Sequence, residues 1–118
     1  MSGVVPRAAL FVLAVAALSG CGGTPGGKKV LGAENRCAAA VEVSVDENLS
    51  SEAPSKPWVL IEPDAWMTLG EVSAPTLAIF VRVPKAETGQ VYPVAMSALI
   101  RTTGPLDLLF AVEGQFCP

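Results

Sequence analysis

The sequence predicts an all-β fold for most of this 118-residue chain. Short apolar stretches alternate with polar residues in the period of two that is typical of half-buried strands. Ten prolines and eleven glycines are distributed along the chain, and they interrupt most stretches long enough to form an amphipathic helix. We therefore expect about six or seven short strands between residue 35 and the C-terminus, at intervals of roughly ten residues.

The clearest predicted strand covers residues 37–46, where apolar and polar side chains alternate. Its apolar face carries Cys37, Ala39, Val41, Val43 and Val45. The polar stretch from Asp46 to Pro57 follows, and its serines and prolines predict a loop.

A hairpin is predicted next, with strands at 58–61 and 66–69 joined by a turn at 62–65. Proline and aspartate in that turn favour the required backbone angles. If Ile61 pairs with Trp66, then Val59, Ile61 and Trp66 share one face, since side chains alternate along each strand. We take this face as the candidate partner-binding surface, although tryptophans in small domains more often belong to the core.

Four further strands are expected at 75–84, 91–94, 96–101 and 106–112. Leu77, Ile79, Val81 and Val83 share one face of the first of these. The second should be an edge strand, because Pro93 cannot donate a hydrogen bond to a neighbour. This number and spacing of strands predict a small immunoglobulin-like two-sheet β-sandwich.

The first 20 residues have the pattern of an export signal. Arg7 precedes an unbroken apolar run from Ala8 to Leu18. Such a run has the length of a secretory signal core, roughly 7 to 15 residues, whereas a membrane-spanning helix needs about 20.

The run ends in Leu18-Ser19-Gly20-Cys21, which resembles the lipobox of bacterial lipoproteins. The resemblance implies cleavage before Cys21 and a lipid on its sulfur, so the chain would be extracytoplasmic and anchored to the cell membrane. An ordinary secretory signal with a nearby cysteine is the alternative. Residues 21–34 are glycine-rich and are expected to form a flexible tether to a domain at 35–118. Within that tether, Lys28 and Lys29 are placed to contact anionic lipid head groups.

The chain has three cysteines, an odd number for an exported protein. If Cys21 carries lipid, Cys37 and Cys117 remain as a pair, and an oxidising compartment favours a disulfide between them. Two buried free thiols are the alternative.

No catalytic or metal-binding constellation is evident in the sequence. The chain has no histidine, which excludes Ser-His-Asp and Cys-His catalysis. Glu62 and Asp64 are the best carboxylate pair, but acidic residues are expected on a turn. We therefore expect no enzyme activity, no metal and no cofactor. The net charge of −3, without a basic stripe, also argues against nucleic-acid binding.

These observations predict a non-enzymatic, lipid-anchored envelope protein that binds or positions another envelope protein or polymer. One alternative is a surface inhibitor or protective factor against a lytic enzyme or protease, acting through the loop from Asp46 to Pro57. A remoter alternative is a hydrolase that uses Glu62 and Asp64.

Overall fold

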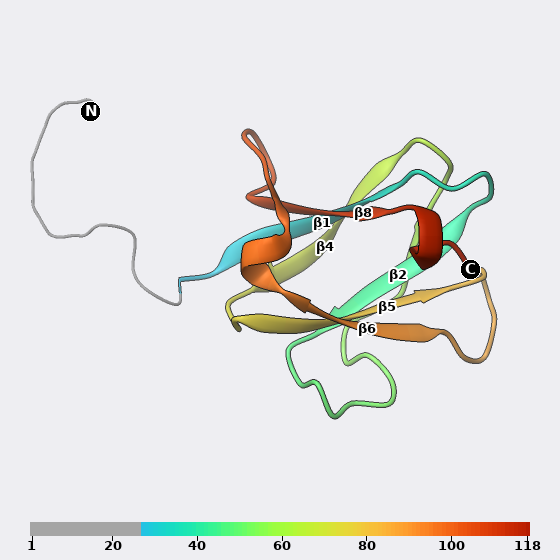
Figure 1. The fold of residues 1–118 in the computed structure, drawn as a ribbon, viewed down its shortest axis with the longest axis horizontal. Coiled ribbons are helices and arrows are strands. Elements are labelled where there is room, and N and C mark those ends of the chain that lie inside the picture. Colours follow the sequence, from blue (N-terminus) through green and yellow to red (C-terminus); the bar gives the residue numbers. More distant parts are fainter. Residues whose placement is uncertain (1–26) are drawn as a thin grey trace, which may run out of the picture.

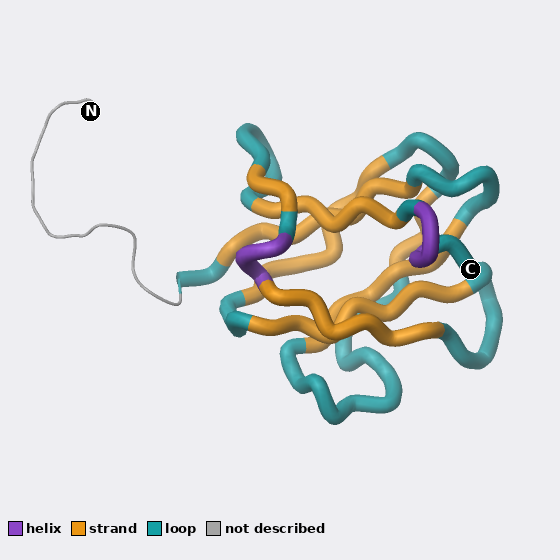
Figure 2. The backbone as a smooth tube through the Cα atoms, viewed as in Figure 1, coloured by secondary structure: helices purple, strands orange, loops and turns teal. Residues whose placement is uncertain are grey.

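The computed structural model describes residues 27–118, which form two four-stranded β-sheets packed against each other (Figures 1 and 2). The signal segment and Cys21 lie outside the described residues. The first sheet has the order β4-β1-β8-β7. Its strands are β4 (Trp66–Val72), β1 (Lys29–Asn35), β8 (Leu108–Val112) and β7 (Ile100–Arg101).

The second sheet has the order β3-β2-β5-β6. Its strands are β3 (Val59–Ile61), β2 (Val41–Asp46), β5 (Thr76–Arg82) and β6 (Gln90–Ala95). Two single 3₁₀ turns complete the described elements, η1 (Met96–Ala98) and η2 (Gly114–Phe116). The all-β prediction is confirmed, and the sheets pack face to face as a sandwich.

The core lies between the two sheets and follows the predicted alternation. Its fully buried members include Leu31, Val41, Val43, Val45, Ile61, Leu77, Ile79 and Val112. Apolar contact between these side chains supplies the main stabilisation, at about 25 cal/mol for each Å² removed from water. The predicted core face of β2 is correct at Val41, Val43 and Val45, but the strand begins only at Val41, and Ala39, predicted on that face, is exposed. The core face predicted for β5 is correct at Leu77, Ile79 and Val81, whereas Val83, just after β5, is 56% exposed.

Strand β1 corrects the expected extent of the tether, which was placed at residues 21–34. The folded chain already begins at Lys29, and β1 occupies the middle of the first sheet. It pairs antiparallel with β4 and parallel with β8. Leu31 and Ala33 are fully buried, so this short alternating segment belongs to the core despite the glycines before it.

The predicted hairpin at 58–69 is wrong, because its two strands belong to different sheets. Ile61 pairs with Val41 in the second sheet, whereas Trp66 pairs with Glu34 in the first. The turn between them crosses the end of the sandwich. Within this turn, Asp64 adopts a φ of 66°. Its N–H donates a hydrogen bond of 2.7 Å to the Asn35 carbonyl oxygen.

The stretch at 96–101 also differs from its predicted single strand. Residues 96–98 form η1, and only Ile100 and Arg101 continue as β7. The N–H of Met96 donates to the Pro75 carbonyl oxygen at 2.8 Å, which holds the chain beside the start of β5 while it passes from one sheet to the other.

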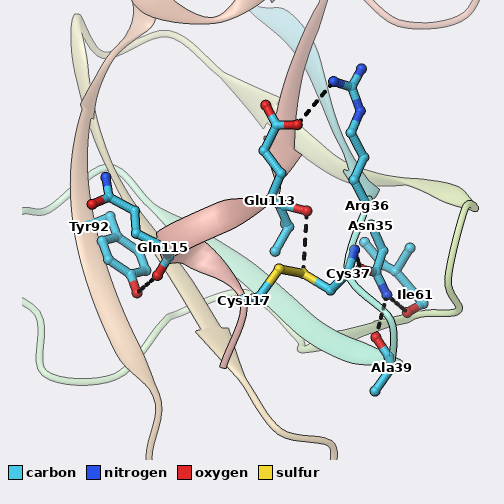
Figure 3. The surroundings of a disulfide bond; sticks show 10 residues. Asn35, Arg36, Cys37, Ala39, Ile61, Tyr92, Glu113, Gln115 and Cys117 are labelled. Carbon is cyan, nitrogen blue, oxygen red and sulfur yellow. Dashed lines mark hydrogen bonds and ion pairs between the residues drawn. A yellow bond between two sulfur atoms is a disulfide. The ribbon is translucent and has the colours of Figure 1, made fainter.

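The predicted disulfide between Cys37 and Cys117 is confirmed (Figure 3). It joins the segment after β1 to the segment after β8, across a sequence separation of 80 residues and a Cα–Cα distance of 5.8 Å. The chain-entropy model assigns about 4.5 kcal/mol to a loop of this length. The bridge therefore holds the first and last strands together at the end of the sandwich away from residue 27 (Figure 1).

Asn35 organises the same end of the molecule through its side chain (Figure 3). Its amide nitrogen donates to the carbonyl oxygens of Ala39 and Ile61, both at 2.9 Å, and its side-chain oxygen accepts the Cys37 N–H at 2.8 Å. The residue is fully buried. A buried amide needs such partners, since each unsatisfied group costs about 1–3 kcal/mol. Asn35 is therefore structural, and it ties β1 to the β3 end of the opposite sheet.

Candidate binding site around Trp66

The strongest candidate site lies on the outer face of the first sheet, where Trp66 is exposed. Trp66 pairs with Glu34, which pairs in turn with Ala111 on β8. These positions alternate with buried Ala33 and Phe110, so their side chains point away from the core. Trp66 remains 47% exposed, an unusual state for the largest apolar side chain.

A cavity of about 220 Å³ adjoins the indole. Its floor comes from the sheet and its wall from the segment between β7 and β8. The lining residues are Glu34, Trp66, Thr102, Thr103, Pro105, Leu106 and Leu109. The site therefore combines an aromatic and aliphatic surface with one carboxylate and two hydroxyl groups.

Gly32 allows the wall of this cavity to lie close to the sheet. A Cβ at position 32 would lie 2.6 Å from Leu106 Cδ1 and 3.0 Å from the Met67 carbonyl oxygen. Leu106 is only 6% exposed, although it lies outside the sandwich core. The absence of a side chain on Gly32 thus provides the space that Leu106 fills.

Hydrogen bonds hold the segment that carries Leu106. The Thr102 hydroxyl donates to the Leu106 carbonyl oxygen at 2.7 Å. Asp107 accepts the Val30 N–H through its carboxylate at 2.7 Å, and its own N–H donates to the Val30 carbonyl oxygen at 2.9 Å. These bonds join the segment to itself and to β1, so they fix the position of the cavity wall.

The rim of the cavity near Glu34 carries two acidic side chains and one basic side chain. Arg36 Nε lies 2.9 Å from a Glu34 carboxylate oxygen, and Arg36 Nη1 lies 3.3 Å from Glu113. The hydrogen bonds to Glu34 and then to Glu113 raise the pKa of Arg36 above its ordinary value. One guanidinium therefore lies between two carboxylates, and their exposure means that the cluster contributes little to stability.

The predicted surface of Val59, Ile61 and Trp66 does not exist as one face. Ile61 is fully buried and Val59 is partly buried, both in the second sheet. Only Trp66 lies at the candidate site. The error follows from the hairpin, because the turn passes between sheets instead of folding the chain back within one.

Sequence reasoning missed the other residues of the site. Glu34 was assigned to the tether, and Leu106 to a strand that begins only at Leu108. Nothing in the local pattern shows that the segment carrying Leu106 folds over β1.

Three other carboxylates, those of Asp46, Glu47 and Glu42, accept hydrogen bonds from backbone N–H groups. The pKa of Asp46 is lowered because its side chain accepts the N–H of Asn48 and then that of Ser55. The pKa of Glu47 is lowered by the N–H groups of Ser73 and Ala74. These acids hold turns in place.

Glu42 lies on β2 and is likewise structural. Its pKa is lowered by the Lys85 N–H, at 2.9 Å, and by the Arg82 guanidinium, at 2.8 Å. Glu62 and Asp64 are both exposed on the turn after β3. Within residues 27–118, no group of three or more acidic, cysteine or histidine side chains is arranged to hold a metal ion.

Between Gly27 and Pro118, no helix has the length and apolar character needed to cross a membrane. No protein-family model matches the chain, and neither the curated proteins nor the solved structures compared with it include a match.

Proposed function

We propose that the protein is a lipid-anchored, non-enzymatic binding module of the cell envelope, built on an immunoglobulin-like sandwich. Cys21 would carry the lipid, and the cavity beside Trp66 would receive part of an envelope protein or polymer. The observation that carries the binding role is the half-exposed indole beside a cavity that the fold has already formed.

The size of the cavity favours one anchoring group over a cofactor. Small-molecule sites usually occupy about 300–1,000 Å³, whereas this cavity has about 220 Å³. One side chain or one ring of a larger partner suits that space. Tryptophan is enriched among residues that dominate binding energy, because its large rigid surface is ordered at low entropic cost.

The position of Trp66 suits a protein held from its N-terminus. Lys29 begins β1, and Trp66 pairs with Glu34 five residues further along that strand. At about 3.3 Å per residue, the indole lies roughly 17 Å from the start of β1 along the strand direction. If the chain is tethered before Lys29, Trp66 lies toward the end of the sandwich opposite to the tether, where a partner can reach it.

Crosslinking in the native cell tests the binding role. A photoreactive amino acid at Thr103, on the cavity rim, should capture a discrete partner that mass spectrometry identifies. Trp66→Ala should reduce capture about thirtyfold, as expected for the loss of 2 kcal/mol at a dominant contact. Leu60→Ala is the matched control, because Leu60 is also 47% exposed but lies in the second sheet. Equal capture by the Trp66→Ala chain would remove the proposal.

Metabolic labelling tests the anchor separately. A fatty-acid analogue should label the wild-type chain and leave Cys21→Ala unlabelled. Recovery of the intact leader attached to an unmodified Cys21 would exclude the lipid anchor.

A second candidate function is inhibition of a lytic enzyme or protease through the loop from Asp46 to Pro57. The supporting observation is that Leu49 is 52% exposed on a loop whose backbone is held by Asp46. A rigid loop binds with a smaller loss of entropy. In this case Leu49→Asp would abolish protection and Trp66→Ala would preserve it, which is the reverse of the result expected for the leading proposal.

A further inference from the structure

A second cavity, of about 320 Å³, lies at the end of the sandwich where Lys29 begins β1. It is bounded by the first sheet, by η1 and by Pro75, which precedes β5. Its lining residues are Lys29, Pro75, Met96, Ser97, Arg101 and Leu108. Two of the six carry a positive charge and none carries a negative charge.

Strand register explains why the two cations converge. Lys29 pairs with buried Val72, and Arg101 pairs with buried Leu108. Paired residues point to the same face of a sheet, so both cationic side chains leave the first sheet on its core side. They do so at the end of the strands, where the apolar core stops and solvent begins.

Neither cation is neutralised by an ion pair within the described residues, since the three ion pairs found there involve only Arg36 and Arg82. Two acids in neighbouring segments are bound to backbone groups. Asp107 accepts the Val30 N–H, and Glu47 accepts the N–H groups of Ser73 and Ala74. The cavity thus offers unpaired positive charge beside the apolar side chains of Met96 and Leu108.

We propose that this cavity binds the phosphate of an anionic phospholipid in the membrane to which the protein is anchored. Lys29 and Arg101 would contact the phosphate, while Met96, Pro75 and Leu108 would lie against the adjoining hydrocarbon. This inference rests on the proposed lipid anchor at Cys21.

The length of the chain before β1 brings the cavity to the membrane surface. Lys29 lies eight positions after Cys21 in the sequence. Fully extended, that length of chain reaches at most about 28 Å. A lipid on Cys21 therefore confines Lys29 to the vicinity of the head groups, at a high effective concentration. Docking would then orient the sandwich and direct the Trp66 end outward.

Photocrosslinking to lipid tests this orientation. The full chain, bearing its lipid, is placed in vesicles of mixed phosphatidylglycerol and phosphatidylcholine, or of phosphatidylcholine alone. A benzophenone amino acid at Ser97, on the cavity wall, should crosslink to phospholipid in the anionic vesicles and much less in the neutral ones. The same probe at Gln115, beside the disulfide at the opposite end, should give little lipid product in either.

Charge-removing variants identify the contacts. Lys29→Gln and Arg101→Gln should each lower the Ser97 crosslink about fivefold, as expected for one interfacial cation. Lys85→Gln, on the turn after β5, is the matched control and should have no effect. If vesicle-bound protein gives the same Ser97 product with Arg101→Gln, or in neutral vesicles, the inference is overturned and the anchor stands. If the protein does not remain with the vesicles, both the anchor and the inference fail.

Discussion

The two tryptophans occupy the outer faces of opposite sheets, and they are used in different ways. Trp58 precedes β3 and packs edge-on against Phe80, with ring centroids 6.2 Å apart, while the Arg82 guanidinium lies 4.0 Å from its ring centroid. Trp66 has no such aromatic or cationic partner among the described residues and is 47% exposed. The first indole covers its sheet, whereas the second borders an open cavity.

The two indoles differ because the outer faces of the two sheets are covered to different extents by the neighbouring loops. The loop from Asp46 to Pro57 folds over the second sheet, where the Ser44 hydroxyl donates to the Lys56 carbonyl oxygen at 3.0 Å. Ser44, Ala78 and Phe80 are therefore buried on the outer side of that sheet. Strand β5 is buried on both faces and consequently has an almost continuous apolar sequence. Among residues 27–118, the outer face of the first sheet is covered by the short segment around Leu106, which stops beside Trp66.

The largest expected effect concerns the two indoles themselves. Trp58→Ala should lower the free energy of unfolding by about 3 kcal/mol, because it removes a packed aromatic ring from Phe80 and Arg82. Trp66→Ala should change it by less than about 1 kcal/mol, since half of its surface is already in water. Urea unfolding of the two variants measures both values. Similar losses would mean that Trp66 is a structural residue, and the contrast between the sheets would disappear.

Gly32→Ala should have an intermediate effect, confined to the first sheet. The new methyl group would collide with Leu106, at a cost of about 1–3 kcal/mol, and would displace the cavity wall. Leu106→Ala in the same chain should remove most of the penalty attributable to the methyl group. A double-mutant cycle of unfolding free energies tests this coupling. Strictly additive effects would show that Leu106 does not determine the space at position 32.

Acid should weaken the covered sheet by a smaller amount. Asp46, Glu47 and Glu42 have pKa values lowered by hydrogen bonds in the folded state. Their contribution to stability is fully present above the unfolded pKa, which is about 4, and is lost as the pH falls through the lower folded pKa. Unfolding midpoints should therefore decline below about pH 4. The decline should be shallower in Asp46→Asn, and an unchanged slope would rule out this role for Asp46.

Part of the fold could be predicted because the alternation of apolar and polar residues along a strand corresponds to its buried and outward faces. Val41, Val43 and Val45 lie on the core face as predicted, and Cys37 pairs with Cys117. Strand β1 was not predicted, because Gly32 and Ala33 carry little hydrophobic signal. The separation of Ile61 from Trp66 also could not be seen, since a turn that stays within a sheet and one that crosses between sheets contain the same kinds of residue. The candidate site depended on that separation and on Leu106 folding over β1, both of which are tertiary features.

The central place of β1 has a mechanical consequence. A pull on the chain before Lys29 would be directed along this strand, which is hydrogen-bonded to β4 on one side and to β8 on the other. The rungs of both ladders would share such a load in shear rather than open one at a time. Beyond them, the Cys37–Cys117 bridge would act as a covalent stop, transferring the remaining tension to the last segment of the chain.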